Sequence, residues 1–132
     1  MAHLNAELVG KGYEAFGRGD LDTVMELFAD DIAWYVPGRS PIAGEYHGKD
    51  GVMAFFGKLM EETGGTFRLA VHDIAASDRH ALAIIDGHAE RNGKSYDFNA
   101  IHVWHLRDGK AEIFRAVPTD AYADDAFWEE TA

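Results

Sequence analysis

The sequence contains no cysteine, which excludes disulfide bonds, thiolate nucleophiles and cysteine metal sites together. It also lacks any apolar run near the roughly 18 residues that a membrane-spanning helix needs. The N-terminal stretch, MAHLNAELVGKGYEAF, has neither the basic region nor the long apolar segment of a signal peptide. From these absences we expect a cytoplasmic protein that has no membrane partner.

Basic residues are scarce, and they are scattered singly along the chain. The net charge of -11 works against a nucleic-acid partner, because such affinity depends on Lys and Arg releasing counterions from phosphates. No HExxH motif, paired histidines or carboxylate cluster has metal-site spacing, and no glycine-rich phosphate loop follows a strand. We therefore expect no metal and no cofactor.

The chain has 132 residues, 47% of them apolar, which suits one domain over 1–132 with a substantial core. Apolar residues recur with helical spacing over residues 4–17, 21–29 and 50–62, and Asp20 stands as the N-cap of the second helix. Residues 32–36 predict a short strand. Residues 37–48, rich in Gly and Pro, predict a loop.

From residue 66 onward the apolar period changes to two, which is typical of strands. The pattern predicts strands over 66–76, 81–91, 95–106 and 110–118. Three helices followed by a meander of strands indicate the α+β class with an antiparallel sheet. The tail, residues 120–132, mixes aromatic residues with acids and is open to two interpretations, a docked helical turn or a segment that faces a partner.

The Asn92-Gly93 pair predicts a two-residue hairpin turn, from which the strand register can be counted outward. Ala83 then lies opposite His102 on one face of the sheet, and Ile84 lies opposite Ile101 on the other. Because both faces carry apolar pairs, we expect the helices to cover one of them. The other face predicts a homodimer interface.

The second hairpin turn, at Asp108-Gly109, leaves two registers open. A two-residue turn sets Arg115 opposite His102, whereas a three-residue loop with a glycine bulge sets Phe114 there. The first register places the Arg115 cation beside the His102 imidazole. The second places the Phe114 ring there, and the contact is then only apolar packing.

Several strings resemble the nuclear transport factor 2-like superfamily, especially its SnoaL-like and ketosteroid-isomerase-like members. They are Gly19-Asp20-Leu21-Asp22, Leu27-Phe28-Ala29-Asp30-Asp31, the Gly44 to Val52 run into Phe55-Phe56, and Asp108-Gly109-Lys110. The resemblance covers nearly the whole chain. It implies a cone in which three N-terminal helices pack on a curved antiparallel sheet around an apolar pocket, with dimers formed through the outer face of the sheet.

The resemblance also allows the steroid isomerase residues to be compared position by position. Aligned on the Gly-Asp-Leu string, the isomerase tyrosine falls at Gly12, beside Tyr13, and the base falls at Val36. The second acid falls at His102. All three positions depart from the pattern, which argues against an isomerase of that type. SnoaL-type cyclases use acid–base residues in an aromatic pocket, and this chain is compatible with that kind of site.

His102 is the leading catalytic candidate, because a lone imidazole in an apolar wall stays neutral and can accept a proton. The alternative is a core histidine bonded to one carbonyl. Asp120, just past the last strand, is a second candidate at the pocket mouth, although capping of the tail helix is the favoured role. Large aromatic and small residues on the inner face suggest a cavity for a flat ligand. The predicted ligand contacts are Tyr13, Trp34, Phe55, Phe98, Trp104, Arg115 and Phe114, or Ile113 in its place.

Two functions follow from these residues. The first is a cofactor-independent isomerase, cyclase or hydrolase that acts on a small apolar or polycyclic substrate, with His102 as the acid–base group. The second is a non-catalytic module for ligand binding or dimerisation on the same fold.

Overall fold

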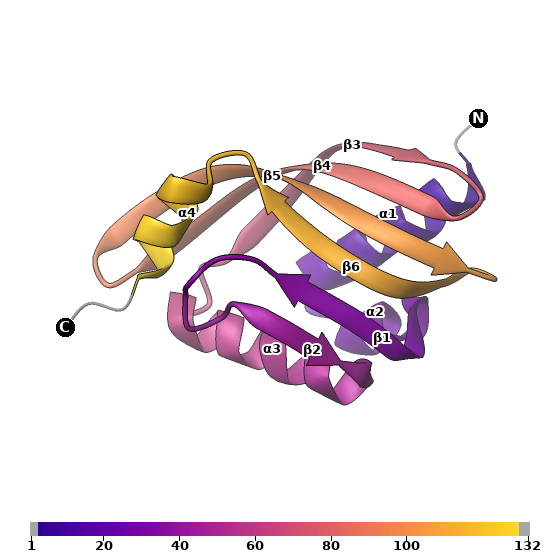
Figure 1. Cartoon of the computed structure of the whole chain (residues 1–132), viewed down its shortest axis with the longest axis horizontal. Helices are drawn as coiled ribbons and strands as arrows, with labels where there is room; N and C mark the ends of the chain where they lie inside the picture. Colours follow the sequence, from indigo (N-terminus) through magenta and orange to yellow (C-terminus); the bar gives the residue numbers. More distant parts are fainter. Residues whose placement is uncertain (1–2, 130–132) are drawn as a thin grey trace.

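The computed structural model describes residues 3–129, which form four helices and one six-stranded sheet (Figure 1). Residues 1–2 and 130–132 lie outside the described residues, and with them both ends of the predicted 1–132 domain and the end of the predicted tail. The helices are α1 (Leu4–Gly17), α2 (Leu21–Leu27), α3 (Gly48–Thr63) and α4 (Ala121–Trp128). The strands are β1 (Phe28–Val36), β2 (Gly44–His47), β3 (Arg68–Ala76), β4 (His80–Arg91), β5 (Lys94–Arg107) and β6 (Lys110–Pro118).

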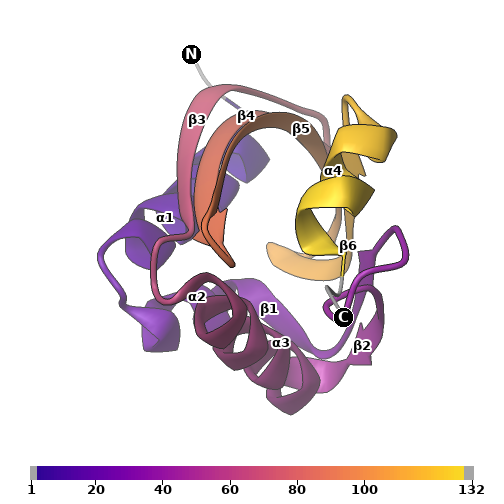
Figure 2. The same ribbon diagram turned by 90° about the vertical axis from the view of Figure 1, so that its left-hand side faces the viewer.

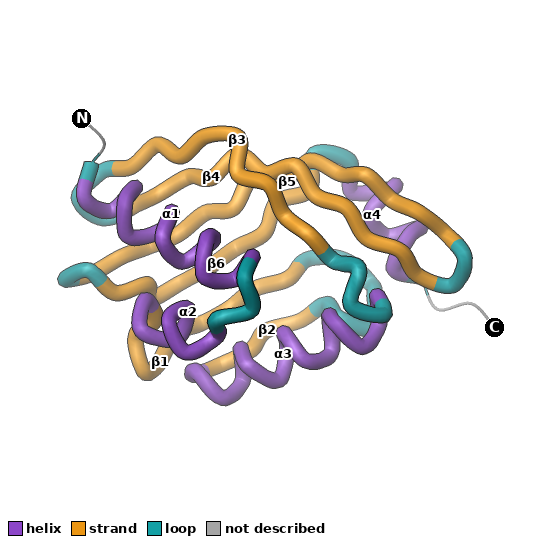
Figure 3. Tube along the Cα trace, turned by 180° about the vertical axis from the view of Figure 1, so that it is seen from behind, coloured by secondary structure: helices purple, strands orange, loops and turns teal. Residues whose placement is uncertain are grey.

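The sheet has the strand order β2-β1-β6-β5-β4-β3 and curves strongly around its concave face. Neighbouring strands are antiparallel except β1 and β6, which run parallel. Figure 2 looks into the open end of the resulting cone, with α4 nearest the viewer. Helix α1 contacts β3 and β4, and α3 contacts β1 and β2, as Figure 3 shows from behind. The α+β class with a curved, mainly antiparallel sheet is thereby confirmed.

The β4–β5 hairpin has the register predicted from its turn. Arg91 pairs with Lys94, and counting outward places Ala83 opposite His102. Asn92 and Gly93 have φ angles of 52° and 77°, the positive values that a two-residue type I′ turn requires at both central positions. The local turn chemistry thus determines which side chains of β5 point toward the helices.

The β5–β6 hairpin corrects both registers that the sequence left open. Its turn is also of two residues, with Arg107 paired to Lys110, but Glu112 is an extra residue in β6 that shifts the pairing by one. His102 therefore lies opposite Ala116, and neither Arg115 nor Phe114 faces it directly. The bulge turns Phe114 toward the concave face and Arg115 toward the convex face.

The second helix begins as predicted, because the Asp20 carboxylate accepts the Thr23 N–H at 3.2 Å. It ends at Leu27, two residues earlier than the predicted 21–29. Phe28 already pairs with Ala111 of β6 and is 1% exposed, so the gain from burying its ring in the sheet outweighs another half-turn of helix. The third helix ends at Thr63, and Gly64 follows as its C-cap, with a φ of 59° that suits glycine.

A short edge strand, β2, occupies part of the predicted 37–48 loop. Its residues Gly44–His47 pair antiparallel with β1. None of them is fully buried, so the segment lacks the apolar alternation by which a strand is recognised in a sequence. The strand forms because the outer edge of β1 has backbone N–H and C=O groups with which it can pair.

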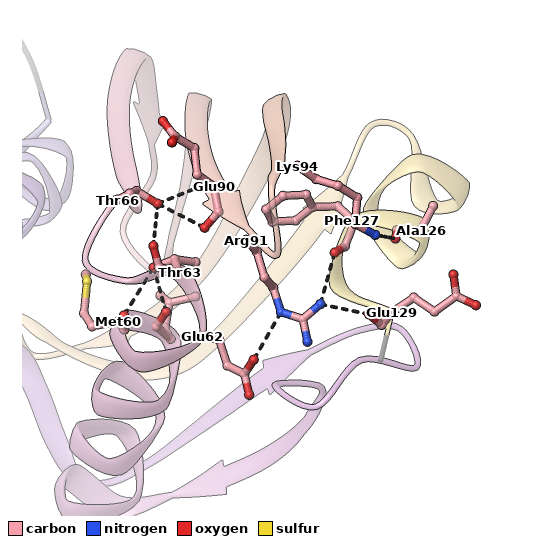
Figure 4. Close-up of polar contacts among 11 residues, drawn as sticks. Met60, Glu62, Thr63, Thr66, Glu90, Arg91, Lys94, Ala126, Phe127 and Glu129 are labelled. Carbon is pink, nitrogen blue, oxygen red and sulfur yellow. Dashed lines mark hydrogen bonds and ion pairs between the residues drawn. The ribbon is translucent and has the colours of Figure 1, made fainter. Parts of the chain in front are cut away.

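Helix α4 is the docked form of the tail, and polar contacts from two neighbouring elements hold it against the β4–β5 hairpin (Figure 4). The buried Arg91 guanidinium donates to the carbonyl oxygens of Phe127 at 3.3 Å and Glu129 at 2.8 Å. Its Nε also contacts the Glu62 carboxylate of α3 at 3.1 Å. Arg91 thus joins α3, the sheet and the end of α4.

Gly87 illustrates how tightly the concave face is packed. It lies opposite Phe98, and a Cβ atom at Gly87 would overlap the Phe98 ring. That ring is stacked between Phe67 and Tyr96, at centroid distances of 5.9 and 5.3 Å, and has little freedom to move aside. The small residue on this wall therefore makes room for an aromatic neighbour.

We predict opposite effects of alanine at two glycines. Gly87→Ala should lower the free energy of unfolding by about 1–3 kcal/mol, because the added methyl group overpacks the Phe98 site. Gly57 lies on the exposed side of α3 with open space around it, so Gly57→Ala should raise the free energy of unfolding by roughly 0.5–1 kcal/mol. Urea unfolding of the two variants checks both signs, and a neutral Gly87→Ala would show that the ring is free to move.

Candidate functional site

The concave side of the sheet lines a cavity of about 130 Å³ that extends to residues of α4. Most of its lining is apolar, and much of that is aromatic. Ring stacking orders the wall, since Trp34 and Phe114 lie face to face with centroids 3.7 Å apart. Among the lining residues are Val9, Leu27, Phe28, Ile42, Phe55, Phe56, Leu59, Phe67, Phe98 and Ala100, together with the polar residues described below.

A short hydrogen-bonded chain lies at the inner end of the cavity. The Tyr13 hydroxyl of α1 contacts His102 Nδ1 at 2.6 Å, and Trp104 Nε1 donates to the same hydroxyl oxygen at 3.0 Å. His102 and Trp104 are two residues apart on β5, so both point to the concave face. The Tyr13 ring is also edge-on to Trp104, with centroids 5.9 Å apart.

The donors and acceptors of this chain assign the proton on His102. The Trp104 indole can only donate, so the Tyr13 oxygen accepts from it and keeps its own O–H to donate. His102 Nδ1 is the one acceptor within residues 3–129 that this O–H can reach, so the arrangement that satisfies the buried hydroxyl has Nδ1 as the acceptor nitrogen of a neutral imidazole. His102 therefore carries its proton on Nε2.

The Nε2–H group of His102 has no hydrogen-bond partner within residues 3–129. Within that part of the chain, Trp34 Nε1 is the only side-chain nitrogen or oxygen that is both fully buried and without a partner. The unpartnered Nε2 of His102 is therefore accessible and not fully buried. His102 lines the cavity and is 8% exposed. The imidazole thus presents one N–H donor to an otherwise apolar space.

Burial sets the protonation states at this end of the cavity. Desolvation lowers the pKa of His102 to about 3, so the imidazole is neutral throughout the physiological range. Desolvation likewise raises the pKa of Tyr13 well above its ordinary value, so the phenol keeps its proton. The site holds a neutral, oriented donor instead of a cation.

The predicted aromatic contacts Trp34, Phe55, Phe98, Trp104 and Phe114 all line the cavity, as does Tyr13. The buried Trp34 N–H has no oxygen or nitrogen partner, but the rings of Phe56 and Trp104 stand at 89° and 82° to its indole. That perpendicular arrangement is suited to weak N–H···π contacts.

Arg115 and Asp120, which the sequence also placed at the site, do not line the cavity. Arg115 is on the convex face, where its guanidinium lies 4.2 Å from the centre of the Tyr35 ring. Asp120 is exposed and accepts the Ala123 N–H at 3.0 Å, the capping role that was its favoured interpretation.

Two cavity residues on α4, Asp124 and Trp128, were missed from the sequence. Burial and the neighbouring Asp125 charge raise the pKa of Asp124 to about 6, partly offset by hydrogen bonds from Tyr96 and Trp128. The helical spacing of Asp124 and Trp128, four residues apart after an aspartate N-cap, is the signal that could have placed them on one face.

Residues 3–129 contain neither a metal site nor a membrane-spanning helix. No group of three His, Cys, Asp or Glu side chains there is arranged to hold a metal ion. No helix in the same range is both long and apolar enough to cross a membrane.

Comparisons with known proteins agree with this architecture. The chain is 40% identical to Bal32a, from a soil-derived mobile gene cassette, with a TM-score of 0.90 over 95% of this chain and 96% of that one. It is 27% identical to a nuclear transport factor 2-like protein of unknown function from Burkholderia pseudomallei, with a TM-score of 0.85 over 96% and 98%. It is 29% identical to an uncharacterised protein of Mycobacterium tuberculosis over 92% of this chain and 94% of the other. Residues 9–112 match the profile of the SnoaL-like domain, and the chain therefore belongs to the SnoaL-like family of the nuclear transport factor 2-like superfamily.

Proposed function

We propose that the protein binds a small, flat, apolar molecule that carries a carbonyl group, and that it catalyses a cofactor-independent isomerisation, cyclisation or hydrolysis of that molecule. His102 donates a hydrogen bond to the carbonyl oxygen, and Tyr13 is its positioning residue. The observation that carries the proposal is the Trp104–Tyr13–His102 chain, which ends in one free N–H at the wall of an apolar cavity.

The proposed chemistry uses His102 Nε2–H as a donor to the carbonyl oxygen of the substrate. As a proton leaves the adjacent carbon to water, negative charge moves onto that oxygen, and the N–H stabilises it without reorganisation. The low dielectric of the aromatic wall strengthens this interaction. Tyr13 supports it by holding the ring in one tautomer through Nδ1.

This role differs from the proton acceptor that the sequence favours for His102. With Nδ1 bonded to Tyr13, the nitrogen left for the ligand carries a hydrogen. The histidine therefore stabilises the carbonyl oxygen that gains negative charge, and water takes the proton from the adjacent carbon.

A second candidate function is binding without catalysis. It is favoured by the pKa of about 3 for His102, which leaves no cationic acid at the inner end of the cavity. The departure of Gly12, Val36 and His102 from the isomerase pattern points the same way. Both functions require the cavity and the N–H donor, and they differ only in turnover.

We predict that the protein accelerates hydrogen–deuterium exchange at the α-carbon of 2-tetralone in D₂O, measured by NMR. His102→Leu should reduce the exchange rate about 100-fold, because it removes the oxyanion donor. Tyr13→Phe should reduce it roughly tenfold, because the imidazole loses its orienting partner. His105→Gln, three residues along β5 and outside the cavity lining, should leave the rate unchanged.

Tryptophan fluorescence of the same samples reports binding. If 2-tetralone binds to the parent and to His102→Leu alike and neither accelerates exchange, the catalytic proposal is wrong and the binding function remains.

We also predict a pH dependence of stability that belongs to His102. The unfolded chain takes up a proton at this residue near pH 6.5, whereas the folded chain does so only near pH 3, so acidification favours unfolding between these values. Relative to His102→Gln, the free energy of unfolding of the parent should fall by about 2 kcal/mol between pH 7 and pH 5. Urea unfolding at both pH values measures the difference, and parallel pH profiles would falsify the neutral buried state.

The convex face supports a further part of the proposal, a homodimer through the sheet. Leu82, Ile84, Ile101 and Val117 are 38–47% exposed there. Ile84 pairs with Ile101, which in turn pairs with Val117, so their side chains form one continuous patch across three strands. A two-fold pairing of two copies buries the same patch on both. At its edge His88 Nδ1 meets the Asp97 carboxylate at 2.7 Å, which leaves a polar rim.

We predict that Ile101→Lys converts a dimer to a monomer, because it places a like charge on both halves of a two-fold interface. Leu4→Lys, which changes a residue of α1 that is 64% exposed and outside the sheet, is the matched control and should remain dimeric. Size-exclusion chromatography with light scattering gives the masses. A monomeric parent protein would contradict the proposed interface.

A further inference from the structure

Asp124 is the only carboxylate among the cavity-lining residues of the described chain. It lies on α4, beside the β4–β5 hairpin. Trp128, one turn further along the helix, lines the cavity beside it. The Asp124 carboxylate contacts the hydroxyl of Tyr96, which is six residues before His102 on β5, so it stands at the α4 end of the cavity, away from Tyr13 and His102.

The position of Asp124 is held from both ends of α4. At the first turn, Asp120 caps the helix, and the Asp125 carboxylate accepts the Arg39 backbone N–H at 3.2 Å. At the last turn, Arg91 binds the carbonyl oxygens of Phe127 and Glu129 (Figure 4). The helix therefore presents its carboxyl group in a prearranged place, as a binding residue requires.

No cation neutralises Asp124 within residues 3–129. Its hydrogen-bond partner on β5 is the Tyr96 hydroxyl at 3.5 Å, and the charged groups beside it on α4, Asp120 and Asp125, have the same sign. The nearby cations are engaged elsewhere, because Lys94, like Arg91, donates to a carbonyl at the far end of α4. The carboxylate keeps acceptor capacity for a further donor.

The polar groups of the cavity thus lie in two places with aromatic walls between them. Tyr96, the neighbour of Asp124, and His102 are six residues apart on β5, and the curvature of the sheet brings their side chains on the concave face closer together than the roughly 20 Å of a flat strand. The inner group, His102 Nε2–H, can only donate, whereas the outer group accepts. A ligand that satisfies both has an acceptor at one end and a donor at the other.

We propose that Asp124 is a specificity-determining residue that accepts a hydrogen bond from a hydroxyl group of the ligand at the α4 end of the cavity. The ligands are then flat cyclic ketones of two or three rings, with the carbonyl oxygen on His102 and a hydroxyl group at the opposite end. This inference rests on the proposed function, because it takes the carbonyl site at His102 as given and adds the second contact.

The test compares 2-tetralone with 6-hydroxy-2-tetralone, which differ only in the outer hydroxyl group. Dissociation constants are measured by tryptophan fluorescence at pH 8. The parent should bind the hydroxylated probe about tenfold more tightly, because a hydrogen bond to an ionised group is among the stronger ones. Asp124→Asn should abolish the difference and leave the affinity for 2-tetralone unchanged. Tyr122→Phe, which changes an α4 residue that is 90% exposed and does not line the cavity, should keep the preference.

The preference should also depend on pH. Because the pKa of Asp124 is raised to about 6, the carboxylate takes up a proton on acidification and becomes a weaker acceptor. The ratio of the two affinities should fall between pH 8 and pH 5 in the parent and stay constant in Asp124→Asn.

Several outcomes would overturn the inference. One is equal binding of the two probes by the parent, and another is no binding of 6-hydroxy-2-tetralone. A third is an equal loss of affinity for both probes in the Asp124→Asn variant, which would indicate a purely structural role for the residue. By contrast, a hydroxyl preference that depends on Asp124 while no exchange is accelerated would leave this inference standing and remove only the catalytic part of the proposed function.

Discussion

The hydrogen bond between Tyr13 and His102 joins the first helix to the centre of the sheet, and the character of the cavity depends on it. The bond satisfies the one imidazole nitrogen that faces α1 and thereby leaves the other for the cavity. The aromatic wall around it desolvates the ring, which keeps the imidazole neutral. An unpaired histidine at this depth would be costly, so the phenol that accepts from Trp104 makes the polar inner end possible.

The opposite end of the cavity depends on a different set of contacts. The buried Arg91 pairs with the half-buried Glu62 carboxylate, and its Nη1 group donates to two carbonyl oxygens at the end of α4. A buried cation is acceptable only when it is paired and hydrogen-bonded in this way. Through it the last helix, which carries Asp124, is tied to the third helix and to the sheet. The cavity is therefore apolar along its length and polar at both ends.

Those parts of the fold that depend on local chemistry were predictable from the sequence. The Asn92-Gly93 turn determines the β4–β5 register, because the positive φ angles that it allows permit only one tight connection. The Asp20 cap determines the start of α2, and the apolar period determines the three N-terminal helices. Since side chains alternate along a strand, the same turn also indicated that His102 and Trp104 share the concave face.

Other features were decided only by tertiary structure, because they depend on contacts between residues far apart in the chain. The bulge at Glu112, which carries Arg115 to the convex face, lies in a strand that pairs with both β5 and β1, and the sequence of the second hairpin alone does not contain that second partner. The strand β2 depends on a free edge of β1, and the place of α4 depends on Arg91. The sequence by itself therefore determined which strand carries the central histidine, and the packing of distant elements decided which groups stand at the two ends of its cavity.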